Sequence, residues 1–155
     1  MQIHIIAIGQ RMDNWVLEGY GEFVKRMPPE CRINLIEVAP NKRTKNSDTR
    51  RIIQEEGERL IAAIPSRSHI IAMDAGGKEW STEQLANQLD QWLGGGRDIA
   101  LLVGGPDGLS NECKAVAESL WSLSKLTLPH PMVRVVIAEQ LYRAWTILQG
   151  HPYHR

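Results

Sequence analysis

The chain has 155 residues, and its 18 Lys and Arg balance 18 Asp and Glu, so the formal net charge is zero. This length fits a single domain, residues 1–155, that buries a sizeable core without disulfides or metals. The balanced charge excludes a generally basic surface, so any contact with nucleic acid must come from a local patch.

The N-terminal segment MQIHIIAIG lacks the basic start and cleavage site of a signal peptide and is typical of a first strand. No apolar stretch approaches the roughly 18 residues that a membrane helix needs, so we expect no membrane contact. The two cysteines, Cys31 and Cys113, have neither metal nor redox spacing. This indicates a reducing compartment and predicts a cytoplasmic protein.

Apolar runs and turn residues predict strands that alternate with helices along the whole chain. We expect strands at residues 2–9, 32–39, 69–74, 98–103 and within 121–128. We expect helices at residues 13–27, 47–64, 81–93, 110–120 and 133–148. Asp13 is the expected cap of the first helix, Ser81 and Gln84 form a capping box, and Gly76-Gly77 form a turn. The alternation is typical of an α/β fold with a mostly parallel sheet flanked by helices.

The helix expected at residues 133–148 carries more apolar surface than one face needs. Its helical stripe consists of Val133, Val136, Ile137, Gln140, Leu141, Ala144, Trp145 and Leu148. Val135, Ala138 and Tyr142 lie outside this stripe. Deep packing within one domain and contact with a second subunit both explain the pattern, and the sequence leaves both open.

A glycine loop, Gly104-Gly105-Pro106-Asp107-Gly108, directly follows the strand expected at residues 98–103. Glycines allow backbone to approach a ligand closely, and parallel sheets bind ligands at the carboxyl ends of their strands. A plain turn is the alternative interpretation. The loop is neither a P-loop nor a dinucleotide fingerprint, because no Gly-Lys-Ser/Thr follows it and no G-x-G-x-x-G follows the first strand.

Two other kinds of chemistry find little support in the sequence. There is no G-x-S-x-G motif, and Cys113 lies in an expected amphipathic helix, which favours packing over nucleophilic catalysis. His130, His151 and His154 lack the Cys or carboxylate partners that would complete a zinc site, so we expect no metal.

A basic loop at Lys42, Arg43 and Lys45 is the candidate RNA-binding site. Arg50 and Arg51 extend it, and only Asp48 opposes them within this stretch. Such a cluster neutralises phosphates of a nucleic acid. A solvated loop and helix start is the alternative interpretation.

Three segments are very similar to one family, the bacterial ribosomal RNA large subunit methyltransferases H, which are small SPOUT-class enzymes. The segments are LLVGGPDGLS at 101–110, SLSKLTLPHPMVRVVIAEQLYRAW at 122–145 and HPYHR at 151–155. The resemblance covers the whole chain, including the N-terminal AIG and the KR-x-KN loop. It implies methylation of N3 of a pseudouridine in large-subunit ribosomal RNA with S-adenosylmethionine. It also implies a homodimer and a deep C-terminal trefoil knot.

By position, the resemblance implies a cofactor pocket made of Met73, Gly104, Gly105, Leu123, Ser124, Lys125, Leu126, Thr127 and Leu128. The family often has another aliphatic residue at position 73 and a small residue at position 125. The candidates for substrate positioning or proton handling are His130, Tyr153, His154 and Arg155. A histidine is a plausible base near neutral pH, but which group takes the proton stays open, and His130 between two prolines has a structural role as its alternative.

Two other functions stay open at this point. One is a different SPOUT reaction, on a transfer RNA base or ribose. The other is a non-enzymatic ribosome-binding module that keeps only the RNA contacts. The intact GGPDG and LSKLTLPHP motifs argue against a loss of cofactor binding.

Overall fold

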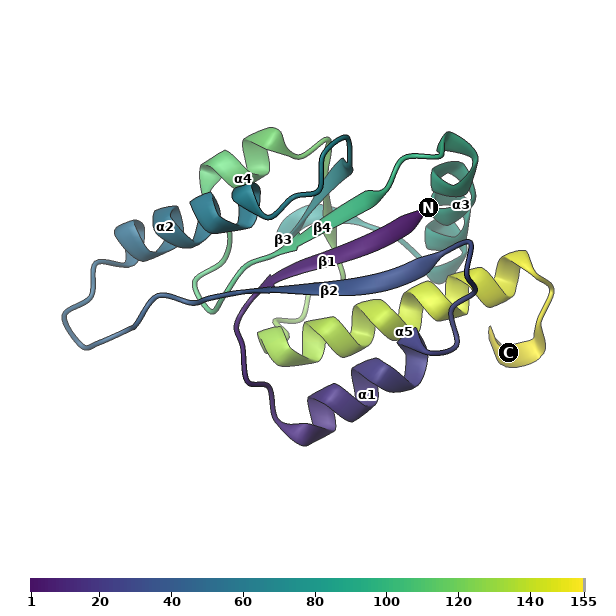
Figure 1. The fold of residues 1–155 in the computed structure, drawn as a ribbon, viewed down its shortest axis with the longest axis horizontal. Helices are drawn as coiled ribbons and strands as arrows, with labels where there is room; N and C mark the ends of the chain where they lie inside the picture. The colour runs from purple at the N-terminus through teal and green to yellow at the C-terminus, as the bar shows by residue number, and fades with distance from the viewer. Residues whose placement is uncertain (155) are drawn as a thin grey trace.

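The computed structural model describes residues 1–154 and contains a five-stranded sheet with helices on both faces (Figure 1). The strands are β1 (Gln2–Ile8), β2 (Arg32–Val38), β3 (His69–Glu79), β4 (Ile99–Val103) and β5 (Ser119–Ser122). They lie in the order β2-β1-β4-β3-β5, and every neighbouring pair is parallel. The predicted α/β fold with a parallel sheet is therefore confirmed.

Five helices and a short terminal turn flank the sheet. They are α1 (Asn14–Val24), α2 (Thr49–Ala62), α3 (Thr82–Gly95), α4 (Asn111–Val116), α5 (His130–Leu148) and the 3-10 turn η1 (Pro152–His154). α5 lies between α1 and α3 on one face, and α2 and α4 cover the other (Figure 1). Within residues 1–154 no helix has the length and apolar character needed to cross a bilayer.

The central strands are apolar without alternation because helices cover both of their faces. All five residues of β4 are buried. In β1, Ile3 and Ile5 belong to the core under α1, α3 and α5, whereas Ile6 and Ile8 belong to the core under α2 and α4. The two layers of helices thus explain why the sequences of β1 and β4 are typical of buried strands.

The helix starts follow the expected capping chemistry in part. Ser81 and Gln84 form the predicted capping box, with the Gln84 N–H donating to Ser81 Oγ at 3.1 Å and the Ser81 N–H donating to Gln84 Oε1 at 2.8 Å. Asp13 occupies the N-cap of α1, but its side chain makes no capping hydrogen bond. Asp48 caps α2, so that helix begins at Thr49 rather than at residue 47.

The turn expected at Gly76-Gly77 is wrong. β3 continues through both glycines to Glu79, and its register with β5 shifts between Met73 and Lys78. A Cβ at Gly77 would lie 2.7 Å from the carbonyl carbon of Leu120, so glycine lets β3 pass close to the backbone of β5. The glycines mark an irregular strand rather than a reversal of the chain.

The segment between α4 and α5 also differs from the prediction. α4 ends at Val116 rather than near residue 120, and β5 ends at Ser122, so residues 123–128 form a loop instead of a strand. α5 begins at His130, earlier than expected, because Pro131 fits a first helical turn that needs no N–H from it.

The extra apolar residues of α5 are packed within the chain. Ala138 and Tyr142 are buried. Val135 faces α1, where a Cβ on Gly19 would lie 3.3 Å from Val135 Cγ1. Deep packing within one chain therefore accounts for the positions outside the apolar stripe.

Candidate functional site

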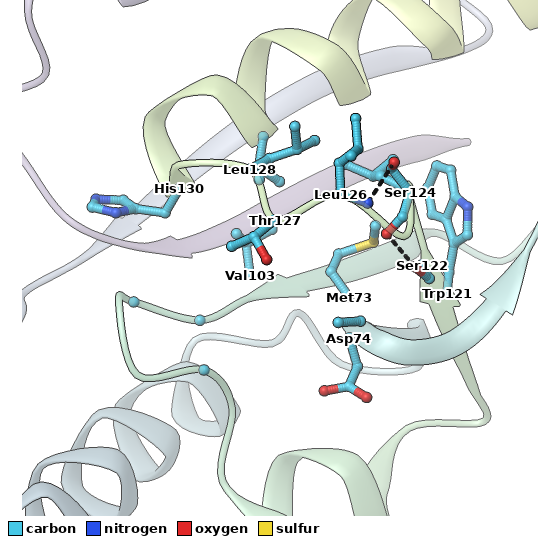
Figure 2. Close-up of a pocket in the computed structure, with 16 residues that line it drawn as sticks. Met73, Asp74, Val103, Trp121, Ser122, Ser124, Leu126, Thr127, Leu128 and His130 are labelled. Atoms are coloured by element: carbon cyan, nitrogen blue, oxygen red, sulfur yellow. Dashed lines mark hydrogen bonds between the residues drawn. The ribbon is translucent and has the colours of Figure 1, made fainter.

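A pocket with a volume of about 190 Å³ opens at the carboxyl end of β4 and the middle of β3, beside the loop after β5 (Figure 2). β3 pairs with β4 through Ala72, so Met73 and Asp74 lie at the edge of the sheet where β4 ends. This is the edge at which parallel sheets bind ligands. All predicted cofactor residues except Lys125 line it: Met73, Gly104, Gly105, Leu123, Ser124, Leu126, Thr127 and Leu128.

The loop after β5 forms one wall of this pocket and is held by its own serines (Figure 2). The Ser122 hydroxyl donates to the Ser124 carbonyl at 3.0 Å, and the Leu126 N–H donates to Ser124 Oγ at 2.9 Å. Lys125 is exposed and does not line the pocket. The loop therefore presents Ser124, Leu126 and Thr127 to the pocket and Lys125 to solvent.

The loop between β4 and α4 closes on itself. The Gly108 N–H donates to the Gly105 carbonyl at 3.0 Å, and a Cβ at Gly104 would lie 2.6 Å from the Gly108 carbonyl carbon. A Cβ at Gly105 would meet Arg43 and Glu56, each at 3.3 Å. We expected these two glycines to spare room for a ligand. The space they leave is instead filled by the loop itself and by an ion pair behind it.

Sequence reasoning missed several residues that line the pocket, among them Asp74, Val103 and Trp121. Asp74 ends the strand expected at residues 69–74, and Val103 ends the strand expected at residues 98–103. Their position at an expected strand end could therefore have identified both. Trp121 was hidden because the fifth strand was placed too late in the chain.

His130, the first residue of α5, also lines the pocket. Burial lowers the pKa of its imidazole, and the positive charges of Arg134 and Arg43 lower this pKa further, whereas Glu56 opposes them. The imidazole is therefore neutral at neutral pH and able to accept a proton.

Arg134 lies one helical turn after His130 and is only 1% exposed. Its Nη1 donates to Glu37 at 2.8 Å, and its Nη2 donates to the Gly9 carbonyl at 2.8 Å. Gly9 has φ +121°, and a Cβ there would lie 3.2 Å from Arg134 Nη2 and 3.5 Å from His130 Nε2. The end of β1 and the start of α5 are thus fastened together beside the pocket.

The turn η1, which contains Tyr153 and His154, follows the C-terminal end of α5 (Figure 1). The Tyr153 ring packs on Tyr142 with centroids 4.7 Å apart, and its hydroxyl donates to Glu139 at 3.2 Å. The turn η1 thus folds back along α5, where Tyr153 contacts side chains nine and twelve residues after His130, and neither Tyr153 nor His154 lines the pocket of its own chain. Arg155 lies outside the described residues.

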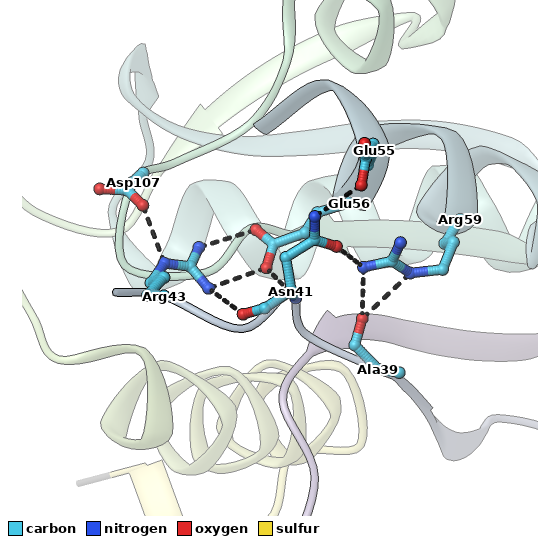
Figure 3. Close-up of polar contacts among 7 residues, drawn as sticks. All are labelled: Ala39, Asn41, Arg43, Glu55, Glu56, Arg59 and Asp107. Carbon is cyan, nitrogen blue, oxygen red and sulfur yellow. Dashed lines mark hydrogen bonds and ion pairs between the residues drawn. The ribbon is translucent and has the colours of Figure 1, made fainter. Parts of the chain in front are cut away.

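The three basic residues of the loop at 42–45 differ in their contacts. Lys42 and Lys45 are exposed, but Arg43 is held by two carboxylates (Figure 3). It pairs with Glu56 at 2.8 Å and with Asp107 at 2.9 Å. The structure therefore presents the two lysines, and not Arg43, as free positive charges.

Metal ligands and cysteines add no further site in the described part of the chain. Among residues 1–154 no three His, Cys, Asp or Glu side chains gather closely enough to hold a metal ion. Cys31 and Cys113 are buried and free, and burial raises the pKa of both thiols. Both cysteines are therefore suited to packing rather than to nucleophilic attack.

A parallel α/β sheet with a mostly apolar pocket at its carboxyl edge is typical of proteins that bind a small ligand at this edge. A family model described as "Predicted SPOUT methyltransferase" matches residues 1–154. The chain therefore belongs to the SPOUT methyltransferase family.

Its relatives match along their full length. The chain is 57% identical over 155 residues to the ribosomal RNA large subunit methyltransferase H of Methylococcus capsulatus, with 100% of both chains covered. It is 55% identical over 155 residues to the protein of the same name from Hahella chejuensis, covering 100% of this chain and 99% of that protein.

Solved structures share the fold at low sequence identity. A probable methylase family protein from Haemophilus influenzae Rd KW20 has a TM-score of 0.59 at 14% identity, covering 99% of this chain and 70% of that one. TrmJ from Z. mobilis ZM4 has a TM-score of 0.57 at 14% identity, covering 92% of this chain and 70% of that one. At these identities the likeness concerns the fold alone.

Proposed function

We propose that this chain transfers the methyl group of S-adenosylmethionine to ring nitrogen N3 of a pseudouridine in large-subunit ribosomal RNA, in the cytoplasm. The observation that carries the proposal is the pocket at the carboxyl end of β4, because every predicted cofactor residue except Lys125 lines it. The printed names of the full-length relatives support ribosomal RNA as the substrate. The choice of N3 rests on the resemblance of the C-terminal motifs.

The pocket fits an adenosyl group. Its walls are apolar at Met73, Val103 and Leu128, and hydroxyl groups are present at Ser124 and Thr127. An adenine ring needs such apolar walls together with a few hydrogen-bonding groups, which the backbone of both loops also supplies.

The chemistry asks the protein mainly for alignment and for removal of a proton. S-adenosylmethionine supplies a methyl group that its sulfonium already activates. Holding the two reactants in line supplies roughly 7–11 kcal/mol of the barrier. His130 lies at this pocket in its neutral form, so it is suited to take the N3 proton or to orient the group that does.

A homodimer completes the site in this proposal. Neither Tyr153 nor His154 lines the pocket of its own chain, so in this proposal Tyr153, His154 and Arg155 serve the pocket of the second copy.

Exposed apolar side chains support such a dimer. Trp15 and Leu17, near the start of α1, are each 51% exposed, and Met132, near the start of α5, is also exposed. In Figure 1 the two helix starts lie at the same end of the molecule. Exposed large apolar side chains are found on surfaces that a partner covers.

Methyl transfer from labelled S-adenosylmethionine tests the proposal. We expect label in the large-subunit RNA of purified ribosomes and none in transfer RNA. Label in transfer RNA alone would point to a different SPOUT reaction. Ribosome binding without any transfer of label would point to a binding module.

A further inference from the structure

A buried carboxylate lies behind the glycine loop of the pocket (Figure 3). Glu56, on α2, is only 2% exposed. It accepts hydrogen bonds from Arg43 Nη1 at 2.9 Å, from Arg43 Nη2 at 2.8 Å and from the Asn41 N–H at 2.9 Å. A buried carboxylate needs such partners to stay ionised, and the two-pronged guanidinium is the strongest of them.

The same guanidinium reaches the glycine loop. Arg43 Nε donates to Asp107 Oδ2 at 2.9 Å, and its Nη1 also donates to the Asn41 carbonyl at 3.3 Å. Arg43 therefore bridges α2 and the loop between β4 and α4. A lysine ammonium has no planar fork and cannot reproduce this arrangement of donors.

Gly105 is in contact with both the pocket and the ion pair. It lines the pocket, whereas Arg43 and Glu56 do not. A Cβ on Gly105 would lie 3.3 Å from Arg43 Nη2 and 3.3 Å from Glu56 Oε1. The ion pair thus supports the loop from behind, against the residue whose other side faces the pocket.

The segment that carries Arg43 is itself fastened to α2. Arg59 donates to the Ala39 carbonyl at 3.1 and 2.8 Å and also to Asn41 Oδ1. Asn41 Nδ2 donates to Glu55 at 2.7 Å. If Arg43 swung out to meet a phosphate, Glu56 would lose its partner while buried, and this is costly.

We propose that Arg43 is a positioning residue of the cofactor pocket and not a contact to RNA phosphates. Together with Glu56 and Asp107 it holds Gly105 where the pocket receives S-adenosylmethionine. This inference rests on the proposed function and divides the basic loop between two tasks. Lys42 and Lys45 face the RNA, and Arg43 between them supports the cofactor loop.

Three variants separate the two tasks. Arg43→Lys keeps the positive charge but loses the fork. Asp107→Ala removes only the tie to the loop and leaves Glu56 paired. The double variant Lys42→Glu/Lys45→Glu changes only exposed charges. Calorimetry with S-adenosylmethionine and ribosome binding at a series of salt concentrations are measured for each, and thermal melting checks folding.

We expect Arg43→Lys to raise the Kd for S-adenosylmethionine about tenfold, the scale of a lost charge-assisted hydrogen bond, with an unchanged salt slope for ribosome binding. Asp107→Ala raises the same Kd by a smaller factor. In turnover it raises the KM for S-adenosylmethionine and leaves kcat nearly constant. The double lysine variant leaves the cofactor Kd unchanged and lowers the salt slope by roughly 1.5, because each phosphate contact contributes about 0.7–0.9.

The inference is overturned if the wild-type chain binds S-adenosylmethionine and both Arg43→Lys and Asp107→Ala bind it within twofold of wild type. A further variant, Arg43→Gln/Glu56→Gln, removes both charges of the ion pair. If this variant folds, binds the cofactor as wild type does and shows a lower salt slope for ribosome binding, Arg43 contacts a phosphate instead. If Arg43→Lys does not fold, Asp107→Ala decides. Absence of cofactor binding by the wild-type chain would contradict the proposed function itself, which distinguishes the two failures.

Discussion

Neighbouring residues in the loop after β5 face different surroundings. Thr127 lines the pocket, and Figure 2 shows its side chain directed into it, whereas Lys125 two positions earlier is exposed outside. The hydrogen bond from the Leu126 N–H to Ser124 Oγ sets this local turn. Thr127 and Lys125 therefore form a matched pair for testing which surface the cofactor occupies.

We predict that Thr127→Trp raises the Kd for S-adenosylmethionine at least about tenfold, because an indole takes up volume that the ligand needs. Lys125→Trp should leave the Kd unchanged. Calorimetry on both folded variants makes the comparison. Equal affinities in the two variants would place the cofactor elsewhere.

His130 supplies the second prediction at this scale. Its pKa lies below the ordinary imidazole value of about 6.5, chiefly because of burial and then because of Arg134. The neutral form needed by a base therefore persists at pH 7, and activity should fall only as the pH drops through the lowered pKa. The free energy of unfolding depends on pH in the same direction. The contribution of His130 to stability is present above pH 6.5 and is lost as the pH falls, because the unfolded chain binds the proton more readily.

The measurement is kcat against pH for the wild type and for His130→Gln. If His130 takes the proton, the wild-type profile has an acidic limb below pH 6.5, and the variant loses about 100-fold or more in kcat together with that limb. An unchanged acidic limb in His130→Gln would assign proton transfer to another group.

At the scale of elements, the sequence predicts the buried strands better than the irregular ones. β1 and β4 are continuous apolar runs, which local pattern alone identifies. The extension of β3 through Gly76 and Gly77 depends on the close approach of Leu120, a tertiary contact that composition cannot show. The boundaries of β5 failed for a related reason: its apolar run continues into the loop that lines the pocket.

Gly77→Ala should destabilise the fold by about 1–3 kcal/mol, because the new Cβ would lie 2.7 Å from the backbone of Leu120 and Trp121. Gly76→Ala is the control, since its nearest neighbour is the movable carboxylate of Asp74 at 3.0 Å. Urea unfolding compares the two variants. Equal midpoints would show that β3 and β5 do not need this close approach.

At the scale of the whole molecule, the site residues fall into two groups. His130 lines the pocket at the start of α5, whereas Tyr153 contacts Glu139 farther along the helix and does not line the pocket. Sequence motifs identified both groups, but only the three-dimensional structure shows that they are apart. The trefoil knot implied by the resemblance stays a prediction.

Removal of Tyr153, His154 and Arg155 should leave the chain folded and able to bind cofactor, because no described residue of η1 is buried. Turnover should fall by about 100-fold or more if the tail positions the reacting base. Methyl transfer and calorimetry on the truncated chain test both statements. Full turnover without the tail would remove it from the site.

Mixing the truncated chain with a full-length Thr127→Trp chain tests the sharing between subunits. In the mixed dimer one intact pocket faces one intact tail only if the tail serves the opposite subunit. Activity should therefore return on mixing. Absence of activity, with heterodimers shown by mass spectrometry, would mean that each chain completes its own site.

The central claim is the identity of the methylated atom, and mass spectrometry of nucleosides from treated ribosomes tests it most directly. Ribosomes that lack the modification are incubated with the protein and S-adenosylmethionine, and their large-subunit RNA is digested to nucleosides. We predict one new species, a pseudouridine carrying a methyl group on N3, which is absent when the Thr127→Trp variant is used. A methyl group on any other atom or nucleoside, or no new species at all, would contradict the proposal.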